Sequence, residues 1–110
     1  MKLAIDLSPE HLQEVRAILT RHIPGREVWV FGSRAKVTAK PTSDLDLCVL
    51  GQEPLTMRVY GPMRIAFEDS VLPMKVDIVE WATIAPEFRR IIEGSHAIIV
   101  PAVKGGECAR

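Results

Sequence analysis

The segment DLDLCVL, residues 44–50, begins with two aspartates separated by one residue. In a strand this spacing places both carboxylates on the same face, with their Cα atoms roughly 7 Å apart. Strands usually avoid Asp, so the pair is unexpected at the start of an apolar run. Carboxylate oxygens are the ligands that Mg²⁺ prefers, usually one or two of them together with substrate phosphates. Asp44 and Asp46 are therefore candidate metal ligands, although such a pair on its own is more often a solvated strand end.

A candidate phosphate-binding turn precedes the two aspartates by ten residues. Gly32 and Ser33 follow the apolar segment EVWVF, residues 27–31. A helix that begins near Ser33 would present unpaired N–H groups, which attract anions. Gly32 would let a phosphate approach the backbone closely, and the Ser33 hydroxyl and Arg34 would add donors. We expect these three residues to bind a nucleotide, and a capped surface helix is the alternative for so short a motif.

A third aspartate, Asp77, stands inside the strand-like segment VDIV, residues 76–79. An unpaired carboxylate in such a strand is expensive to bury. If Asp77 shares a face with Asp44 and Asp46 on a neighbouring strand, it completes a cluster of three carboxylates. The alternative is an ion pair with Lys75 or Arg64, or exposure at a strand end.

Sequence patterns predict the elements that would position these residues. Ser8 and Pro9 are typical of a helix start, Pro24-Gly25 is typical of its end, and Gly61-Pro62 should kink or split a later helix. The predicted helices are residues 9–23, 33–40, 55–71 and 86–94, and the predicted strands are 27–31, 44–50, 74–81 and 96–101. This alternation predicts an α/β (α+β) fold, a small mixed β-sheet flanked by helices. We expect one domain over residues 1–104 and a flexible tail over 105–110.

Composition excludes several classes of protein. The chain has 110 residues, of which 47% are hydrophobic, and its 14 basic residues balance 14 acidic ones. A strongly basic nucleic-acid-coating protein is therefore not expected. No apolar run approaches the ~20 residues of a membrane span and there is no signal-peptide core. Cys48 and Cys108 lie in dissimilar surroundings, so we predict no disulfide and a cytoplasmic protein without a membrane partner.

The three carboxylates and the phosphate-binding turn together specify a reaction. Three clustered carboxylates would hold two divalent ions, which lie ~3.5–4 Å apart in two-metal sites. The turn would hold the β- and γ-phosphates of a nucleoside triphosphate. The predicted chemistry is therefore nucleotidyl transfer, in which a hydroxyl attacks the α-phosphate in line. Mg²⁺ is the expected cofactor, with Mn²⁺ as a substitute.

The pattern Gly-Ser, ten residues, then DLD, with a later Asp in VDIVEW, resembles the DNA polymerase β-like nucleotidyltransferase superfamily. The small size and the run FEDSVLPMKVDIVEWATIAPEFRRIIE resemble its minimal nucleotidyltransferases (MNT), which are encoded as antitoxin partners of HEPN-domain toxins. The resemblance covers residues 10–100. It implies that Gly32 and Ser33 hold the triphosphate, that Asp44 and Asp46 bind both metals, and that Asp77 binds the catalytic metal and helps to activate the acceptor.

The implied activity is transfer of AMP from ATP to a tyrosine of a HEPN toxin. Two alternatives stay open: a non-catalytic antitoxin that acts by binding, and adenylylation of a small hydroxyl compound. Larger relatives carry a helical domain that this chain lacks, so we expect a second chain to complete the site, and a homo-oligomer also stays open. Candidate docking residues are Ile98, Ile99 and Val100, or the apolar side of residues 57–67.

Overall fold

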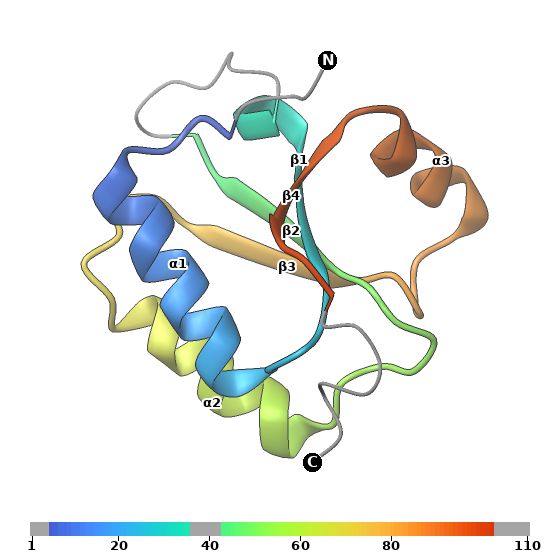
Figure 1. Ribbon diagram of the computed structural model, residues 1–110. Coiled ribbons are helices and arrows are strands. Elements are labelled where there is room, and N and C mark those ends of the chain that lie inside the picture. The colour runs from blue at the N-terminus through green and yellow to red at the C-terminus, as the bar shows by residue number, and fades with distance from the viewer. Residues whose placement is uncertain (1–4, 36–42, 103–110) are drawn as a thin grey trace.

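The computed structural model describes residues 5–35 and 43–102 and shows a four-stranded mixed sheet with helices on both faces (Figure 1). The sheet order is β3-β2-β1-β4; β1 is antiparallel to β2 and β4, and β2 is parallel to β3. The predicted fold class is confirmed. The elements are α1 (Pro9–His22), β1 (Val28–Phe31), the 3-10 helix η1 (Gly32–Ala35), β2 (Leu45–Val49), α2 (Met57–Glu68), β3 (Val76–Glu80), α3 (Pro86–Gly94) and β4 (His96–Val100).

The start of α1 follows directly from its sequence. The Ser8 hydroxyl accepts a hydrogen bond from the backbone N–H of His11 at 3.2 Å, and Pro9 occupies the first turn. Such a cap satisfies one of the N–H groups that a helix start leaves without a partner. Pro86 likewise occupies the first turn of α3, although the N-cap residue there, Ala85, provides no side-chain hydrogen bond.

Two expected helices differ from the prediction. The helix expected over residues 33–40 is a single 3-10 turn as far as Ala35, and residues 36–42 lie outside the described part of the chain. Gly61-Pro62, which was expected to kink or split this helix, does not split it, because α2 is one helix with Pro62 inside it. Proline there removes one bond, to the carbonyl of exposed Arg58, and Met63 and Phe67 remain buried in the core.

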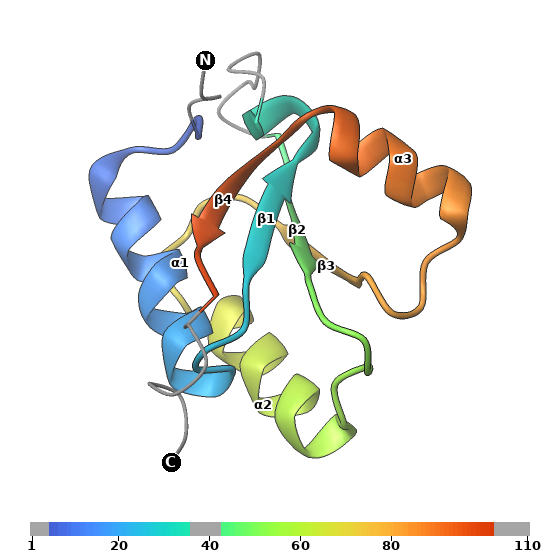
Figure 2. The same ribbon diagram turned by 45° about the vertical axis from the view of Figure 1, so that its right-hand side comes forward.

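The core lies between the sheet and the pair α1 and α2, which pack together on one face (Figures 1 and 2). Leu45, Leu47 and Val49 of β2 point into it and are almost wholly buried, as their alternation predicts. The intervening residue Asp46 therefore faces the other side of the sheet, where α3 lies. Other core side chains are Val15, Leu19, Val28, Val30 and Ile99.

The α3 face of the sheet is less completely covered. Trp29 and His96 stack there with ring centroids 3.7 Å apart, and Trp81 packs edge-on to Trp29 at 5.6 Å. Cys48 is buried and free, burial raises the pKa of its thiol to about 11, and Cys108 lies outside the described residues. The predicted tail over residues 105–110 also lies outside them. In the described ranges, no helix is long and apolar enough to cross a bilayer.

Candidate active site

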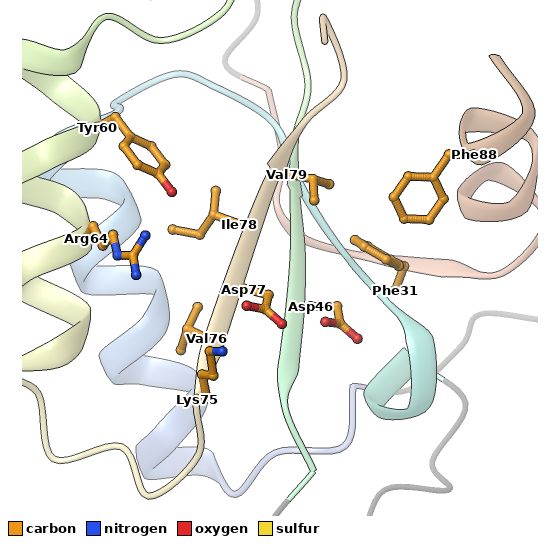
Figure 3. Close-up of a pocket in the computed structure, with 10 residues that line it drawn as sticks. All are labelled: Phe31, Asp46, Tyr60, Arg64, Lys75, Val76, Asp77, Ile78, Val79 and Phe88. Carbon is orange, nitrogen blue, oxygen red and sulfur yellow. The ribbon is translucent and has the colours of Figure 1, made fainter. Parts of the chain in front are cut away.

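A row of side chains crosses the sheet at the level of the expected carboxylates. The strand registers pair Phe31 with His96 on one side and with Asp46 on the other, and Asp46 with Asp77. Cross-strand partners share a face, and adjacent strands lie about 4.8 Å apart. Asp46 and Asp77 are therefore neighbours on the α3 face, as Figure 3 shows.

Gly32 brings the chain out of β1 against this carboxylate pair. Its φ is +76°, a conformation that side chains rarely adopt. A Cβ atom at this position would meet Asp46 Oδ2 at 2.6 Å. The bare Cα therefore makes room for the Asp46 carboxylate beside the Gly32–Ala35 turn. The sequence predicted an anion site at the start of a helix. In the described residues, the backbone that could form this site is the single turn Gly32–Ala35, which includes Ser33.

Asp44 lies at the rim of the site. It is exposed and comes directly before β2. Its charge still acts on Asp46, because Asp77 and Asp44 both help to raise the Asp46 pKa. Within residues 5–35 and 43–102, no three His, Cys, Asp or Glu side chains form a group ready to hold a metal ion. The structure thus brings two of the three predicted carboxylates together and leaves the third at the rim.

The donors present nevertheless fit a divalent cation. Asp46 and Asp77 supply adjacent carboxylate oxygens, the hard ligands that Mg²⁺ prefers. Gly32 places the backbone of the Gly32–Ala35 turn directly against the Asp46 carboxylate.

The electrostatics of Asp46 predict how stability responds to pH when no divalent cation is present. Burial raises the pKa of Asp46 above its ordinary 3.8, and the charges of Asp77 and Asp44 raise it further. The folded protein then binds the Asp46 proton more tightly than the unfolded chain does. Asp46 therefore lowers the stability of the fold as the pH rises from the pKa of Asp46 in the unfolded chain through its raised pKa in the folded protein. Asp46→Asn should therefore raise the melting temperature at pH 7, by a few degrees at most because solvent screens this partly exposed carboxylate.

Melting curves in chelator between pH 3 and 7 provide the test. The gain should disappear at the acid end, where Asp46 is protonated and uncharged in both states. A lower melting temperature for Asp46→Asn at pH 7 would mean that this carboxylate stabilises the fold through a partner.

A cavity of about 590 Å³ opens over the carboxylate pair (Figure 3). Phe31 and Phe88 line it on the α3 side of the sheet, beside Asp46 and Asp77. The cavity wraps around the edge strand β3 and also reaches α2. The carboxylates therefore lie in a hollow large enough for a small-molecule substrate.

The basic residues of the cavity do not neutralise Asp77. Arg64 of α2 pairs with Glu68 at 3.2 Å, an exposed contact between successive helical turns. Among the described residues, Asp77 makes no ion pair with Lys75 or Arg64, although both line the same cavity. The alternative in which Asp77 is a structural ion-pair partner is therefore not supported.

Arg34 does not face the cavity. Its side chain is 5% exposed, and its guanidinium donates to the backbone carbonyls of Asp6 at 2.7 Å and of Ser43 at 2.9 and 3.2 Å. The Arg34 carbonyl in turn accepts a hydrogen bond from the Asp6 N–H at 2.7 Å. Arg34 thus ties the glycine turn to Ser43, the residue before Asp44. The expected contact between Arg34 and a nucleotide stays a prediction.

Replacing Arg34 should cost stability. Arg34→Ala removes a buried charged donor from two partly buried carbonyls, and we expect a loss of about 3 kcal/mol in the free energy of unfolding. Urea unfolding measures this, with Arg21→Ala, an exposed arginine of α1, as the matched control that should change little. An Arg34→Ala protein with unchanged stability but weakened ATP binding would instead support the predicted phosphate contact.

Comparison with known proteins decides the family. The profile of the nucleotidyltransferase domain matches residues 12–99. The chain belongs to this family. Over 95 residues it is 41% identical to the probable protein adenylyltransferase MntA of Haemophilus influenzae, covering 86% of this chain and 83% of that protein.

Solved structures support the same assignment. A structure described as a candidate minimal nucleotidyltransferase is 32% identical, with a TM-score of 0.62 and coverage of 84% of this chain and 89% of that one. The complex of a tri-AMPylated Shewanella oneidensis HEPN toxin with its MNT antitoxin matches at 18% identity, with a TM-score of 0.64 and coverage of 84% and 71%. The latter likeness shows the fold alone. The predicted resemblance to minimal nucleotidyltransferases is confirmed, and the chain is a nucleotidyltransferase.

Sequence reasoning missed the aromatic wall of the nucleotidyltransferase cavity. The sequence places Phe88 in the predicted helix over residues 86–94 and Phe31 in the predicted strand over residues 27–31, and it gives neither a role in the site. One available signal was the position of Phe31 immediately before Gly32. No comparable local signal connects Phe88 with the site, because α3 reaches it only through the tertiary fold.

Proposed function

We propose that this chain transfers AMP from ATP to a tyrosine hydroxyl of a HEPN-type toxin and thereby acts as its antitoxin in the cytoplasm. The observation that carries the proposal is the cross-strand pair Asp46 and Asp77, which lines one cavity and whose Asp46 carboxylate lies against Gly32. The similarity to a protein adenylyltransferase, and the fold shared with an antitoxin bound to an AMPylated HEPN toxin, support the choice of reaction and acceptor.

Each site residue has its own role in the proposed reaction. The backbone at Gly32 and Ser33 receives the β- and γ-phosphates, and Asp46 and Asp77, with Asp44 at the rim, would hold the cation. Mg²⁺, as two ions or with Mn²⁺ in its place, supplies charge neutralisation for the triphosphate when bound. Asp77 stands next to Asp46 and orients the acceptor hydroxyl. The hydroxyl oxygen forms a bond to the α-phosphorus, the bond to the bridging oxygen breaks, pyrophosphate leaves, and the hydroxyl proton is lost toward Asp77 or water.

Exposed apolar side chains offer docking surface for the partner. Met57 and Ile65 of α2 are 73% and 58% exposed, and Ile98 of β4 is 49% exposed. Ile99, which was also expected to dock a partner, is 1% exposed and belongs to the core. The cause is the strand alternation of β4, which turns neighbouring residues to opposite faces.

A non-catalytic antitoxin is the second candidate. The observation that favours it is that the described carboxylates do not close into a three-residue metal group. In that case the exposed residues of α2 and β4 would silence the toxin by covering it. The chain would then need neither ATP nor a divalent cation for its effect.

Intact-mass measurement of the partner distinguishes the two candidates. The HEPN-type chain encoded beside this one is incubated with the purified protein, Mg²⁺ and ATP, and in parallel with chelator. Adenylylation predicts a mass gain of one or more AMP groups on the partner that chelator abolishes. Toxin inhibition without a mass gain would contradict the proposal and support the passive antitoxin. Neither modification nor association would point to a small hydroxyl compound as acceptor.

A further inference from the structure

Two phenylalanines form an aromatic wall beside the carboxylates. Phe31, at the end of β1, and Phe88, in the first turn of α3, meet edge to face with ring centroids 5.6 Å apart and planes at 83°. Both line the cavity and remain only partly buried. Aromatic pairs of this geometry usually pack in a core, whereas this pair leaves ring surface open to the hollow above Asp46.

The order of groups across the sheet assigns the acceptor to the side away from this wall. The triphosphate begins at the Gly32 turn, and Asp46 and Asp77 follow toward β3, the edge strand. In-line displacement requires the attacking oxygen to lie opposite the departing pyrophosphate. The acceptor therefore approaches past Asp77, over the open edge of β3.

The ribose and the base must then extend from the α-phosphate in a different direction from both the pyrophosphate and the acceptor. Along the strands on the α3 face, the cavity is bounded by Phe31, Val79 and Phe88 (Figure 3). These side chains carry no hydrogen-bonding group. An apolar wall with an exposed aromatic face suits the flat surface of a nucleobase, which stacks on aromatic rings whatever its identity.

We propose that Phe31 and Phe88 form the platform on which the nucleobase of the triphosphate stacks, with Phe88 as the residue that determines affinity for the base. This inference rests on the proposed function, since it requires a triphosphate at the Gly32 turn. Because the wall has no hydrogen-bonding groups, it should bind the large purine rings more tightly than pyrimidines and should discriminate only weakly between ATP and GTP.

Binding of two ligands to variants at position 88 tests the platform. Isothermal titration calorimetry in Mg²⁺ measures the Kd of ATP and of inorganic tripolyphosphate, which has no base. Phe88→Ala should weaken ATP binding about tenfold, leave tripolyphosphate binding unchanged, and reduce the preference for ATP over UTP. Phe88→Trp should retain ATP binding. Ile91→Ala, a residue 67% exposed on the same helix, is the matched control and should bind both ligands like the wild type.

Three outcomes would overturn the inference. If Phe88→Ala binds ATP as the wild type does but raises the KM for the acceptor protein, the wall belongs to the acceptor. If ATP and tripolyphosphate weaken equally, Phe88 supports the fold of α3 rather than the base. In both cases the proposed nucleotidyl transfer stands. If the wild type binds neither ligand, the platform and the proposed function fail together.

Discussion

Asp77→Asn is expected to abolish adenylyl transfer while leaving the fold and the association with the partner intact. Asp77 lies beside Asp46 on an edge strand, where it borders the path of the acceptor. Asparagine preserves the shape of the side chain but loses the charge that holds the cation and attracts the acceptor proton. A loss of about 10²–10⁴-fold in the transfer rate is typical when a group of this kind is removed.

The rate of AMP addition to the partner, followed by intact mass, measures this effect. Co-purification and the dissociation constant for the partner show whether binding survives. Asp69→Asn is the matched control, because Asp69 is an exposed aspartate at the end of α2, outside the cavity. Transfer within tenfold of wild type would exclude Asp77 from the reaction. Loss of partner binding would instead place Asp77 in the docking surface.

The sequence predicts the face on which the carboxylates lie because that information is local. Leu45 and Leu47 must enter the core, so strand alternation turns Asp46 to the other side. The Gly32 turn, the capped α1 and the mixed sheet are likewise encoded by short patterns. The fold class therefore follows from residues that are close together in the chain.

The register and the separation of the carboxylates could not be predicted in this way. Asp46 is the cross-strand partner of Asp77 only because the segment between β2 and β3, which includes α2, returns the chain to the sheet in this parallel register. Asp44 could be assigned to the same face by spacing, but its exposure depends on where β2 begins.

Arg34 shows the same limit for a single side chain. Its place next to Ser33 suits a phosphate contact, and nothing local distinguishes that role from a structural one. Its acceptors are the carbonyls of Asp6 and Ser43, which lie 28 and 9 residues away in the chain. A guanidinium can satisfy several oxygens at fixed angles, so burial between two backbone segments decides its role.

Gly32→Ala should remove transfer activity and destabilise the protein, for two separable reasons. The backbone at position 32 has φ +76°, and a residue with a Cβ pays roughly 1–2 kcal/mol to adopt such a conformation. The new Cβ would also stand 2.6 Å from Asp46 Oδ2, so the carboxylate must move. Even a small displacement of a positioned catalytic group costs about 10²-fold in rate.

Gly61→Ala provides the matched control for the same chemical change. Gly61 lies in α2, and a Cβ there has nothing within 4 Å. Alanine at this helical position should stabilise the protein by about 0.4–1 kcal/mol and leave transfer unchanged. Urea unfolding and the intact-mass assay compare the two glycine variants directly.

A double-mutant cycle with Asp46→Ala separates backbone strain from the clash. Once the Asp46 carboxylate is absent, Gly32→Ala should cost only the strain of its φ angle, and the difference between the two backgrounds measures the contact. Equal costs in both backgrounds would mean that Asp46 moves aside freely, and the loss of activity would then have to come from the turn itself. A smaller cost in the Asp46→Ala background would show that the glycine is needed because the carboxylate occupies the space of its missing side chain.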